Sequence, residues 1–572
     1  MSLSATDPAW ILNARNGVNY VATLISADGT ERTQQIAVAD WPAWVQQHEH
    51  PNSPRWVFND TALVYPTLLN AGVRVARAHD LRLCHAILRD SAFVAGGESL
   101  RHATAWEVAP AAEPSERPIE ALFDFGVQGP RHVPGDPADV RAEFDRQRAI
   151  LDAADGRLRL LTVAESTGAL IAAEMRSAGL PWDVLAHEQM LAETLGVRPP
   201  GGGTPSIMVQ RADEVRQLLG DPTVSLDSQP KLLRALHRAG IMVESTSKWE
   251  LEEQTHPAIE PLLEYKKLSR LYSANAWAWL SEWVRDGRFR PVYVPGGVVT
   301  GRWASSGGGA LQIPRALRAA VRAAPGWRLI VADVAQLEPR VLAAMSGDLA
   351  MADAARGQDL YSGLVDRGIV ATRQEAKIAV LGAMYGSTTG EAGRLVPRLR
   401  RAFPQAMAMV DDAAQTGEDG GIVSTLLGRS SPPASDEWTA VQRAATDADA
   451  DSSSEQRARR SARDRGRFTR NFIVQGTAAE WALAWLAEIR RGLAALPETT
   501  GQKTEPSGAA FQAVPHLAFF LHDEVILHVP GDLADAAADV VRQAAARAAT
   551  LLFGTFPLDF PLDLKIAENA GK

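Results

Sequence analysis

One stretch, His516-Leu-Ala-Phe-Phe-Leu-His-Asp-Glu-Val-Ile-Leu-His-Val-Pro530, is the pattern around which the other features of the chain are organised. Two apolar, β-prone runs, residues 517–521 and 525–529, flank the polar break His522-Asp523-Glu524, and this predicts a β-hairpin. Adjacent carboxylates at the tip of such a hairpin are well placed to hold a hard cation such as Mg²⁺ against a phosphate. Taken alone, an acidic turn is more often a solvated break between strands, so this interpretation depends on the rest of the chain.

The composition is typical of a soluble globular protein with several domains. The chain has 572 residues, of which 46% are hydrophobic and 22% charged. It contains no long apolar run and no basic region before an apolar core at its N-terminus, so we expect a cytoplasmic protein without membrane contact. Cys84 is the only cysteine, which excludes an internal disulfide. The net charge of −9 leaves nucleic acid open as a partner, because phosphate affinity depends on local basic clefts.

Alternation and helical spacing predict the main elements in chain order. The first 135 residues or so read as a mixed α/β unit with strands at residues 20–25 and 55–59 and a helix at 60–71. Helices are expected over residues 165–178, 229–239 and 256–283. A buried strand at residues 327–332 should end at Asp333 and be followed by a helix over 337–346.

Residues 372–385 form the most regular predicted helix. Arg373, Lys377, Leu381 and Tyr385 follow one another at i+4 steps and share one face. Two cations, an apolar residue and a phenol in line suit a flat, phosphorylated ligand, with the charges on its phosphates and the other two side chains beside its base. The alternative is an ordinary helix with two basic residues near its N-terminus, where the helix dipole disfavours them.

Two polar insertions are predicted near residues 430–466 and 497–507. The acidic run Asp447–Glu455 is expected to be mobile. Six arginines follow between Arg457 and Arg467, and they either track a phosphate backbone or form a solvated helix face.

Seven short motifs, taken in order, resemble those of the family A DNA polymerases, the group of bacterial DNA polymerase I. They are Glu264-Tyr-Lys-Lys-Leu-Ser-Arg-Leu271, Thr300-Gly-Arg302 with Leu311-Gln312-Ile-Pro314, Asp333-Val-Ala-Gln-Leu-Glu-Pro-Arg340, Arg373-x3-Lys377-x3-Leu381-Gly-x2-Tyr385-Gly386, Thr425-Leu-Leu-Gly-Arg429, Arg467-x3-Asn471-x3-Gln475-Gly-Thr-Ala-Ala479 and His522-Asp-Glu524. Each is weak alone, but seven in the right order are hard to obtain by chance. The resemblance covers roughly residues 165–572.

This resemblance implies an α/β and α+β multidomain fold, with an RNase H-like, exonuclease-type N-terminal domain before a right-hand polymerase. The polymerase would have an antiparallel palm sheet with helical thumb and fingers. The expected ranges are 1–150 for the degenerate 3′–5′ exonuclease-like domain, 151–325 for connecting helices and thumb, 326–350 for the first palm segment, 351–425 for the fingers and 426–572 for the second palm segment. We expect no counterpart of the family's 5′-nuclease domain in these 572 residues.

The resemblance also implies template-directed DNA synthesis from a primer 3′-hydroxyl by a monomeric, nucleoid-associated enzyme. Its partners would be primer-template DNA and dNTPs, and its cofactors two Mg²⁺ ions, for which Mn²⁺ can substitute. The implied metal ligands are Asp333, the carbonyl of Val334, and Asp523, with Glu524 and Lys377 as further catalytic groups. The implied dNTP-binding residues are Gln336, Glu338, Tyr361, Arg373, Lys377, Leu381 and Tyr385. The implied DNA-binding residues are Arg302, Gln312, Arg340, Arg429, Arg467, Asn471, Gln475 and His522.

Departures from the family pattern fall at the base-stacking surface and in the N-terminal domain. Leu381 stands where the family has Phe or Tyr, and Tyr361 replaces a phosphate-binding His. In the N-terminal domain the expected first strand, at Asn19–Ala22, has no Asp-x-Glu, and Leu63 occupies the second acidic position. Only Asp145 plausibly survives of the four carboxylates that the nuclease needs. We therefore expect no proofreading, and a role in repair or gap filling.

Two alternatives stay open. A single-subunit RNA polymerase of the phage type shares the two metal-binding aspartates and the Arg/Lys/Tyr pattern, but Glu338 would close the space that a ribose 2′-hydroxyl needs. A retired polymerase that only binds DNA would account for Leu381 and Tyr361, yet such a site has no reason to retain Asp333 and Asp523.

Overall fold

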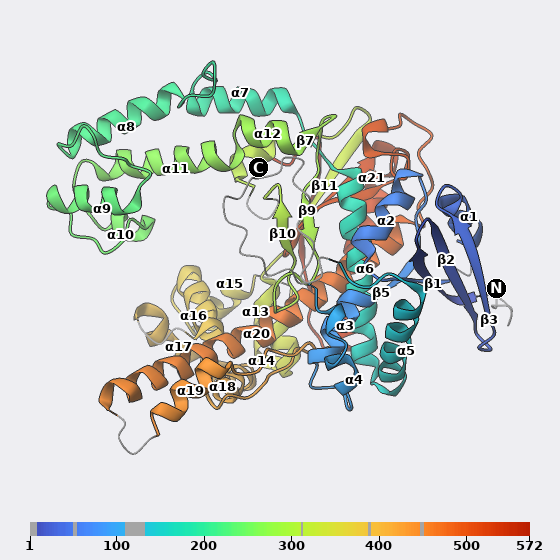
Figure 1. Ribbon diagram of the computed structural model, residues 1–572. Helices are drawn as coiled ribbons and strands as arrows, with labels where there is room; N and C mark the ends of the chain where they lie inside the picture. The colour runs from blue at the N-terminus through green and yellow to red at the C-terminus, as the bar shows by residue number, and fades with distance from the viewer. Residues whose placement is uncertain are drawn as a thin grey trace. The chain divides into compact units, whose positions relative to one another are not determined.

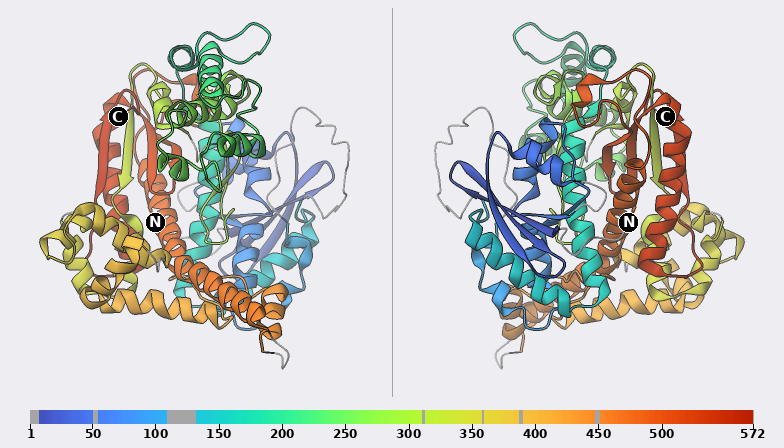
Figure 2. Two further views of the ribbon diagram at one scale, coloured as in Figure 1. Left: turned by 90° about the vertical axis from the view of Figure 1, so that its left-hand side faces the viewer. Right: turned by 90° about the vertical axis from the view of Figure 1, so that its right-hand side faces the viewer.

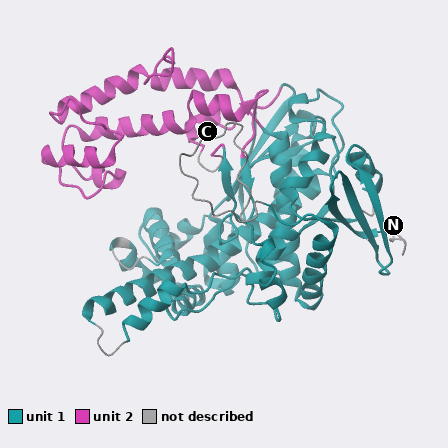
Figure 3. Cartoon of the chain, in the orientation of Figure 1, with its two compact units in different colours: residues 1–179, 292–307, 325–567 teal, residues 180–291, 308–324, 568–572 magenta. Residues whose placement is uncertain are grey.

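The computed structural model describes residues 8–49, 54–108, 132–309, 313–357, 359–386, 390–446 and 451–571. The chain divides into two compact units (Figure 3): unit 1 comprises residues 1–179, 292–307 and 325–567, and unit 2 comprises residues 180–291, 308–324 and 568–572. The first boundary between the two units falls at residue 179, and the expected domain ranges stay a prediction. In the part of the chain that is described, no helix is long and apolar enough to cross a membrane.

Unit 1 begins with a five-stranded sheet of order β3-β2-β1-β4-β5. Its strands are β1 (Pro8–Asn16), β2 (Asn19–Ser26), β3 (Glu31–Ala37), β4 (Arg55–Phe58) and β5 (Arg77–Asp80). β1 pairs antiparallel with β2 and parallel with β4. The expectation that Asn19–Ala22 lies on the first strand was wrong, because these residues belong to β2. β1, with the sequence Pro-Ala-Trp-Ile-Leu-Asn-Ala-Arg-Asn, also carries no carboxylate.

Helices cover this sheet and connect it to the rest of unit 1 (Figure 1). They are α1 (Trp41–His48), α2 (Thr61–Asn70), α3 (Leu81–Asp90), α4 (Glu98–Arg101), α5 (Pro137–Ala153) and α6 (Gly156–Ala178), with a 3₁₀ turn at Thr104–Trp106. The side chain of Asp155 caps the first turn of α6, and the helix ends before Gly179 as its sequence predicts. Leu170 and Ala178 of α6 pack into the same core as Trp56 and Phe58 of β4.

The second sheet of unit 1 is antiparallel, with the order β12-β13-β11-β14. It comprises β11 (Trp327–Val334), β12 (His516–Leu521), β13 (Glu524–Pro530) and β14 (Leu562–Ala567). The hairpin predicted from residues 516–530 is thus confirmed, and β13 lies between its hairpin partner and the distant β11. Helix α21 (Ala534–Phe553) contacts β11, β13 and β14, and Figure 2 shows it along this sheet. A two-stranded ribbon of β9 (Val292–Val294) and β10 (Ala304–Gly307) completes this part.

A group of helices forms the remainder of unit 1 around one apolar core. They are α13 (Leu337–Ser346), α14 (Leu349–Ala355), α15 (Leu360–Asp366), α16 (Arg373–Tyr385), α17 (Gly390–Ala402), α18 (Pro404–Glu418), α19 (Asp436–Ala444) and α20 (Ser452–Leu493), with 3₁₀ turns at Glu505–Ser507 and Gly531–Leu533. The helix predicted over 372–385 is confirmed, and Thr372 and Glu375 close a capping box at its start.

The long helix α20 corrects one expectation. Of the acidic run 447–455, residues 447–450 lie outside the described part of the chain. Asp451 caps α20 through the backbone N–H of Ser454, and residues 452–455 form the first turn of its 42 residues. These residues are therefore ordered as a helix start, because a carboxylate followed by serines and Glu455 satisfies the free N–H groups.

Unit 2 is mainly helical and has its own core. Its elements are α7 (Val184–Leu195), α8 (Ser206–Leu218), α9 (Gln229–Arg238), α10 (Lys248–Glu252), α11 (Ile259–Asn275), α12 (Trp277–Trp283), the 3₁₀ helix Arg315–Ala320, and the short strands β6 (Leu180–Pro181), β7 (Val284–Arg285) and β8 (Arg288–Phe289). The single helix predicted over 256–283 is two helices, because Ala276 adopts an extended backbone between them.

Candidate active site

Two aspartates, Asp333 near the end of β11 and Asp523 in the turn between β12 and β13, lie at one edge of the antiparallel sheet, where these strands end. Asp333 is the residue opposite Glu524 in the pairing of β11 with β13. The backbone N–H of Val334 donates to the carbonyl of Asp523 at 2.9 Å, so Asp523 lies beside the Asp333-Val334 segment. His522 adopts a left-handed backbone conformation with φ 56°, which makes the hairpin turn only two residues long.

The electrostatics of this edge suit a cation. Burial raises the pKa of Asp523 to about 6, and the charge of Asp333 adds to the rise. Among the described residues, no group of three or more Asp, Glu, His or Cys side chains is arranged to hold a metal ion. The sheet offers two carboxylates, which is the number through which Mg²⁺ is usually bound when substrate phosphates and waters complete its shell. Glu524 is buried, and its charge contributes to a raised pKa of the buried Tyr293, after burial itself.

A cavity of about 300 Å³ adjoins this edge of the sheet. It brings together Asp523 and His522 of the hairpin, Arg302 of the β9–β10 connection, the start of α13, and the face of α16 that the i+4 spacing predicts. The predicted residues that line it are Arg302, Gln336, Glu338, Tyr361, Lys377, Leu381, Tyr385, His522 and Asp523. Ala478, Ala479, Ala482 and Leu483 of α20 and the aromatic side chains of Trp303 and Phe520 complete the lining.

Glu338 is held from two sides in this cavity. Its Oε1 pairs with the guanidinium of Arg302, and its Oε2 accepts a hydrogen bond of 2.6 Å from the hydroxyl of Tyr385. Burial raises the pKa of Tyr385, and the hydrogen bond to Glu338 raises it further. The Tyr385 side chain is 39% exposed, so solvent also reaches this contact. The three side chains come from a loop, α13 and α16, and together they close one end of the cavity.

Asp359 organises a second contact that sequence reasoning did not identify. Gln336 Nε2 donates to Asp359 at 2.7 Å, and Arg373 Nη2 donates to it at 2.8 Å. Although burial opposes the change, hydrogen bonds from Arg373 and Ser362 lower the pKa of Asp359. The guanidinium of Arg373 also lies 5.4 Å from the ring centre of Tyr361. Arg373 is therefore engaged with Asp359 here, whereas Lys377 is exposed at the cavity.

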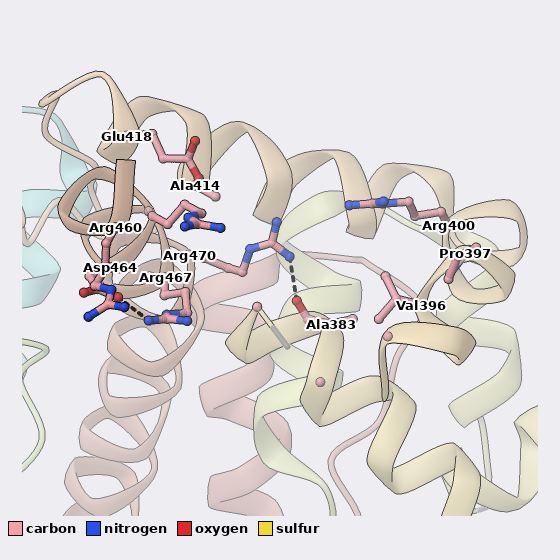
Figure 4. Close-up of a pocket in the computed structure, with 15 residues that line it drawn as sticks. Ala383, Val396, Pro397, Arg400, Ala414, Glu418, Arg460, Asp464, Arg467 and Arg470 are labelled. Atoms are coloured by element: carbon pink, nitrogen blue, oxygen red, sulfur yellow. Dashed lines mark hydrogen bonds and ion pairs between the residues drawn. The ribbon is translucent and has the colours of Figure 1, made fainter. Parts of the chain in front are cut away.

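A larger cavity of about 560 Å³ lies between α16, α17, α18 and α20, and arginines line it (Figure 4). They are Arg400, Arg460, Arg463, Arg467 and Arg470, against the acids Glu418 and Asp464. Arg467 pairs with Asp464, and Arg470 donates to the carbonyl of Ala383 at 2.7 Å. Arg400 comes from α17, and spacings of three and four residues along α20 put the other four arginines on one face of that helix. Of the six arginines that the sequence left open, Arg460, Arg463 and Arg467 thus line a cavity.

Three predicted DNA contacts need comment. Arg340 is fully buried, and its guanidinium donates to the carbonyls of Ala335, Ala355 and Asp559, so it is engaged within the protein here and its contact with DNA stays a prediction. Arg429 is largely buried and donates to Glu165 at 2.7 Å, which also removes it from the surface. Gln312 lies outside the described residues.

The other predicted DNA contacts stay partly accessible. Asn471 and Gln475 follow Arg467 on α20, and Gln475 accepts a hydrogen bond of 2.9 Å from Thr300. Desolvation lowers the pKa of His522, and the charge of Arg302 lowers it further.

The N-terminal domain uses its acidic residues for structure. Asp60 caps α2 and pairs with Arg82, and Asp80 caps α3. Asp145 lies on the surface and pairs with Arg141 on the same helix. Leu63, at the expected acidic position, is 43% exposed. Asp60 and Asp80 are thus helix caps and Asp145 is an ion-pair partner, and among the described residues no three Asp, Glu, His or Cys side chains are grouped to hold a metal ion.

Comparison with known proteins shows which family shares this arrangement. The sequence model for DNA polymerase family A matches residues 212–571, which is more than half of the chain. The chain belongs to DNA polymerase family A. This family A member is 29% identical over 396 residues to the thermostable DNA polymerase I of Thermus filiformis, a match that covers 62% of this chain and 42% of that protein. It is 30% identical over 347 residues to DNA polymerase I of Chloroflexus aurantiacus, covering 56% of this chain and 33% of that protein. The chain thus spans less than half the length of these curated relatives.

A solved structure confirms the predicted fold class. The polymerase domain of Pol1 from M. smegmatis, in complex with a DNA primer-template and dNTP, matches the family A chain with a TM-score of 0.66 at 17% identity. The match covers 100% of this chain and 99% of that one. The N-terminal sheet domain and the polymerase part therefore both belong to the shared architecture.

Proposed function

We propose that this chain is a template-directed DNA polymerase that adds deoxynucleotides to a primer 3′-hydroxyl by a two-metal mechanism. The observation that carries the proposal is the cavity of about 300 Å³, where Lys377, Leu381 and Tyr385 of α16 face Asp523 of the hairpin. Phosphate-binding, stacking and metal-binding groups from separate segments there share one space. Its size also falls within the range of small-molecule sites.

The carboxylates of Asp333 and Asp523, with the carbonyl of Val334, would hold two Mg²⁺ ions. Such ions would activate the attacking hydroxyl and neutralise charge on the transferred phosphoryl group. The side chains of Lys377 and Arg373 would bind the triphosphate. Arg373 would release Asp359 in order to contact the phosphates. The Lys377 ammonium, exposed at the cavity, would also supply a proton to the leaving pyrophosphate. Glu524 would act as an auxiliary acid near the primer end.

Glu338 would select the sugar, because Arg302 and Tyr385 hold its carboxylate in the cavity. A fixed carboxylate beside C2′ excludes a ribose hydroxyl by contact and charge, which favours DNA over RNA synthesis. Leu381 would pack beside the base with less surface than an aromatic ring. We therefore expect lower nucleotide affinity than an aromatic residue would provide, not loss of activity.

Asn471, Gln475, His522 and Arg302 would contact the primer-template in its minor groove, where acceptors lie in similar places for every correct base pair. The arginine-lined cavity between α17, α18 and α20 would hold the phosphates of the unpaired template strand, with Arg467 at its edge. The N-terminal domain would be structural and without proofreading, which suits gap filling in repair by a monomeric, nucleoid-associated enzyme.

Primer extension tests the proposal. Wild type, Asp523→Ala and the control Asp539→Ala would be given a primed template, Mg²⁺ and either dNTPs or rNTPs. Asp539 is an exposed acid on α21 that pairs with Arg542, so its loss leaves the site intact. We expect dNTP extension by wild type and control that EDTA abolishes and Mg²⁺ or Mn²⁺ restores, with near-total loss in Asp523→Ala. Preferential use of rNTPs would favour the RNA polymerase alternative, and no extension by folded, DNA-binding wild type would favour the retired-polymerase alternative.

A further inference from the structure

A buried charged cluster lies behind the cavity, and the chemistry proposed above does not use it. Arg429, which follows α18 in the chain, donates through Nη2 to Glu165 of α6 at 2.7 Å. Their side chains are only 11% and 1% exposed. Glu480 of α20, also buried, accepts hydrogen bonds from Thr425 and from the backbone N–H of Leu427 at 3.0 Å. Two helices that are far apart in the sequence, α6 and α20, therefore converge on the segment 425–429.

Stability alone does not account for this cluster. A buried ion pair loses so much hydration that apolar residues of similar volume commonly replace it without loss of stability. Burial raises the pKa of Glu165 and raises that of Glu480 to about 7, and the charge of Arg429 opposes both changes. The cluster thus contains one cation, Arg429, and two carboxylates whose ionisation is disfavoured by burial. Its position is better explained by what it touches.

The ion pair supports the backbone that carries Arg302. A Cβ atom at Gly301 would lie 2.5 Å from Arg429 Nε, and one at Gly296 would lie 2.8 Å from Glu165 Oε1. Both glycines have positive φ, 85° and 59°, and they bracket the turn between β9 and β10. Gly301 immediately precedes Arg302, which pairs with Glu338 in the cavity. The absence of side chains lets the pair pack directly on this turn.

The N-terminal domain holds the other side of Arg429. Ser91 Oγ donates to the carbonyl of Gly428 at 2.6 Å, and the backbone N–H of Ala92 donates to Ser430 Oγ at 2.8 Å. The two residues that flank Arg429 are thus fastened to the loop after α3. Helix α6, which follows the N-terminal domain in the chain, supplies Glu165. Contacts from the loop after α3 and from α6 therefore lead to the turn that carries Arg302.

We propose that the Arg429–Glu165 pair is a positioning device: it holds the turn from Gly296 to Arg302 so that Arg302 meets Glu338 in the nucleotide cavity. Arg429 and Glu165 act through Arg302 and touch no substrate. The kinetic consequence rests on the proposed polymerase function, whereas the structural consequence does not. The N-terminal domain, through residues 91–92, and the helix α6 that follows it are part of this support.

The first test is amide hydrogen exchange of the turn. The double variant E165M/R429M removes both charges of the ion pair together, and Glu480 keeps its hydrogen bonds from Thr425 and Leu427. The reporters are the amides of Gly301 and Val298, which donate to the carbonyls of Val298 and Arg302. We expect exchange of residues 296–302 to become about tenfold faster, as local opening becomes easier, with an unchanged urea unfolding midpoint. Exchange at the wild-type rate in a folded double variant would overturn the proposal.

The matched control is a second buried pair in unit 1. Arg490 pairs with Glu174 at 2.7 Å, with side chains 9% and 8% exposed, and contacts the carbonyls of Val75 and Ala76. E174M/R490M should accelerate exchange near residues 75–76 and leave residues 296–302 unchanged. An equal effect of both double variants on residues 296–302 would mean general loosening and would also refute the proposal. If E165M/R429M does not fold, E165Q keeps the side-chain shape, and it should accelerate exchange of the same turn about threefold.

The second test is kinetic. In E165M/R429M we expect the KM for dNTP to rise about tenfold while kcat stays within about threefold, because chemistry at Asp333 and Asp523 is not altered. The preference for dNTP over rNTP should also fall, because Arg302 no longer holds Glu338 in place. An unchanged KM together with faster exchange would show that the turn does not position Arg302 for nucleotide binding. A wild type that extends no primer would reject the proposed function, and the exchange result would still decide whether the pair holds the turn.

Discussion

Replacing Tyr385 with Phe should weaken sugar selection by an amount that the structure allows us to calculate. The substitution keeps the ring and removes only the hydroxyl, which donates to Glu338 at 2.6 Å. A hydrogen bond to a charged group contributes about 1.5–3 kcal/mol when water cannot replace it. Tyr385 is 39% exposed, so water replaces part of the contact. We therefore expect a loss of about 1 kcal/mol in the fixing of Glu338, or about fivefold in preference for dNTP over rNTP.

The assay is single-nucleotide incorporation on a primed template, with kcat/KM measured for matched dNTP and rNTP. The control is Tyr361→Phe. Tyr361 lines the same cavity, and its hydroxyl makes no hydrogen bond to another described residue, although burial raises its pKa to about 12. It should keep the wild-type preference. Discrimination within twofold of wild type in Tyr385→Phe, or an equal loss in Tyr361→Phe, would refute the reasoning that Tyr385 fixes Glu338.

Three further predictions concern stability, pH and DNA affinity. Glu174→Gln should lower the free energy of unfolding by about 3 kcal/mol, because it leaves the buried Arg490 without its anion. Urea denaturation measures this free energy. The control Asp539→Asn, which breaks an exposed pair, should change it by less than about 0.5 kcal/mol. Burial lowers the pKa of His79 to about 4 in a site shared with Gln147, Cys84, Arg55, Glu143 and Arg148. His79 is therefore neutral in the folded protein, and the free energy of unfolding should fall as the pH drops from about 6.5 towards 4. Unfolding midpoints measured over this pH range should decline less in His79→Gln than in wild type. An equal decline in both proteins would contradict the role given to His79. Arg463→Gln should weaken binding of a primer-template with a single-stranded 5′ overhang, and it should reduce the slope of log K against log salt concentration by about one. The control Arg542→Gln should change neither quantity. An equal loss of affinity for blunt duplex would mean that Arg463 does not contact the single-stranded overhang.

Local patterns were sufficient for the elements that carry the chemistry. The hairpin with His522 and Asp523 at its turn, the strand that ends near Asp333, and the helix from Arg373 to Tyr385 are all found where their sequences predict them. Each depends on interactions within a few residues, such as strand alternation, a polar turn, or the capping box at Thr372. The i+4 spacing on α16 likewise predicted side chains that line one cavity.

Interactions between distant segments were not predictable in the same way. Arg340, Arg373, Arg429 and Arg467 look alike in sequence, yet one is fully buried, two pair with Asp359 and Glu165, and the last borders a surface cavity. The partner of Arg429 is 264 residues away. The sequence by itself determined the hairpin, the helices and the family of the chain, because those depend on short-range patterns. Only the tertiary structure decided which charges face the ligand and which hold the backbone, because burial and long-range pairing decide whether a charge remains available to a ligand.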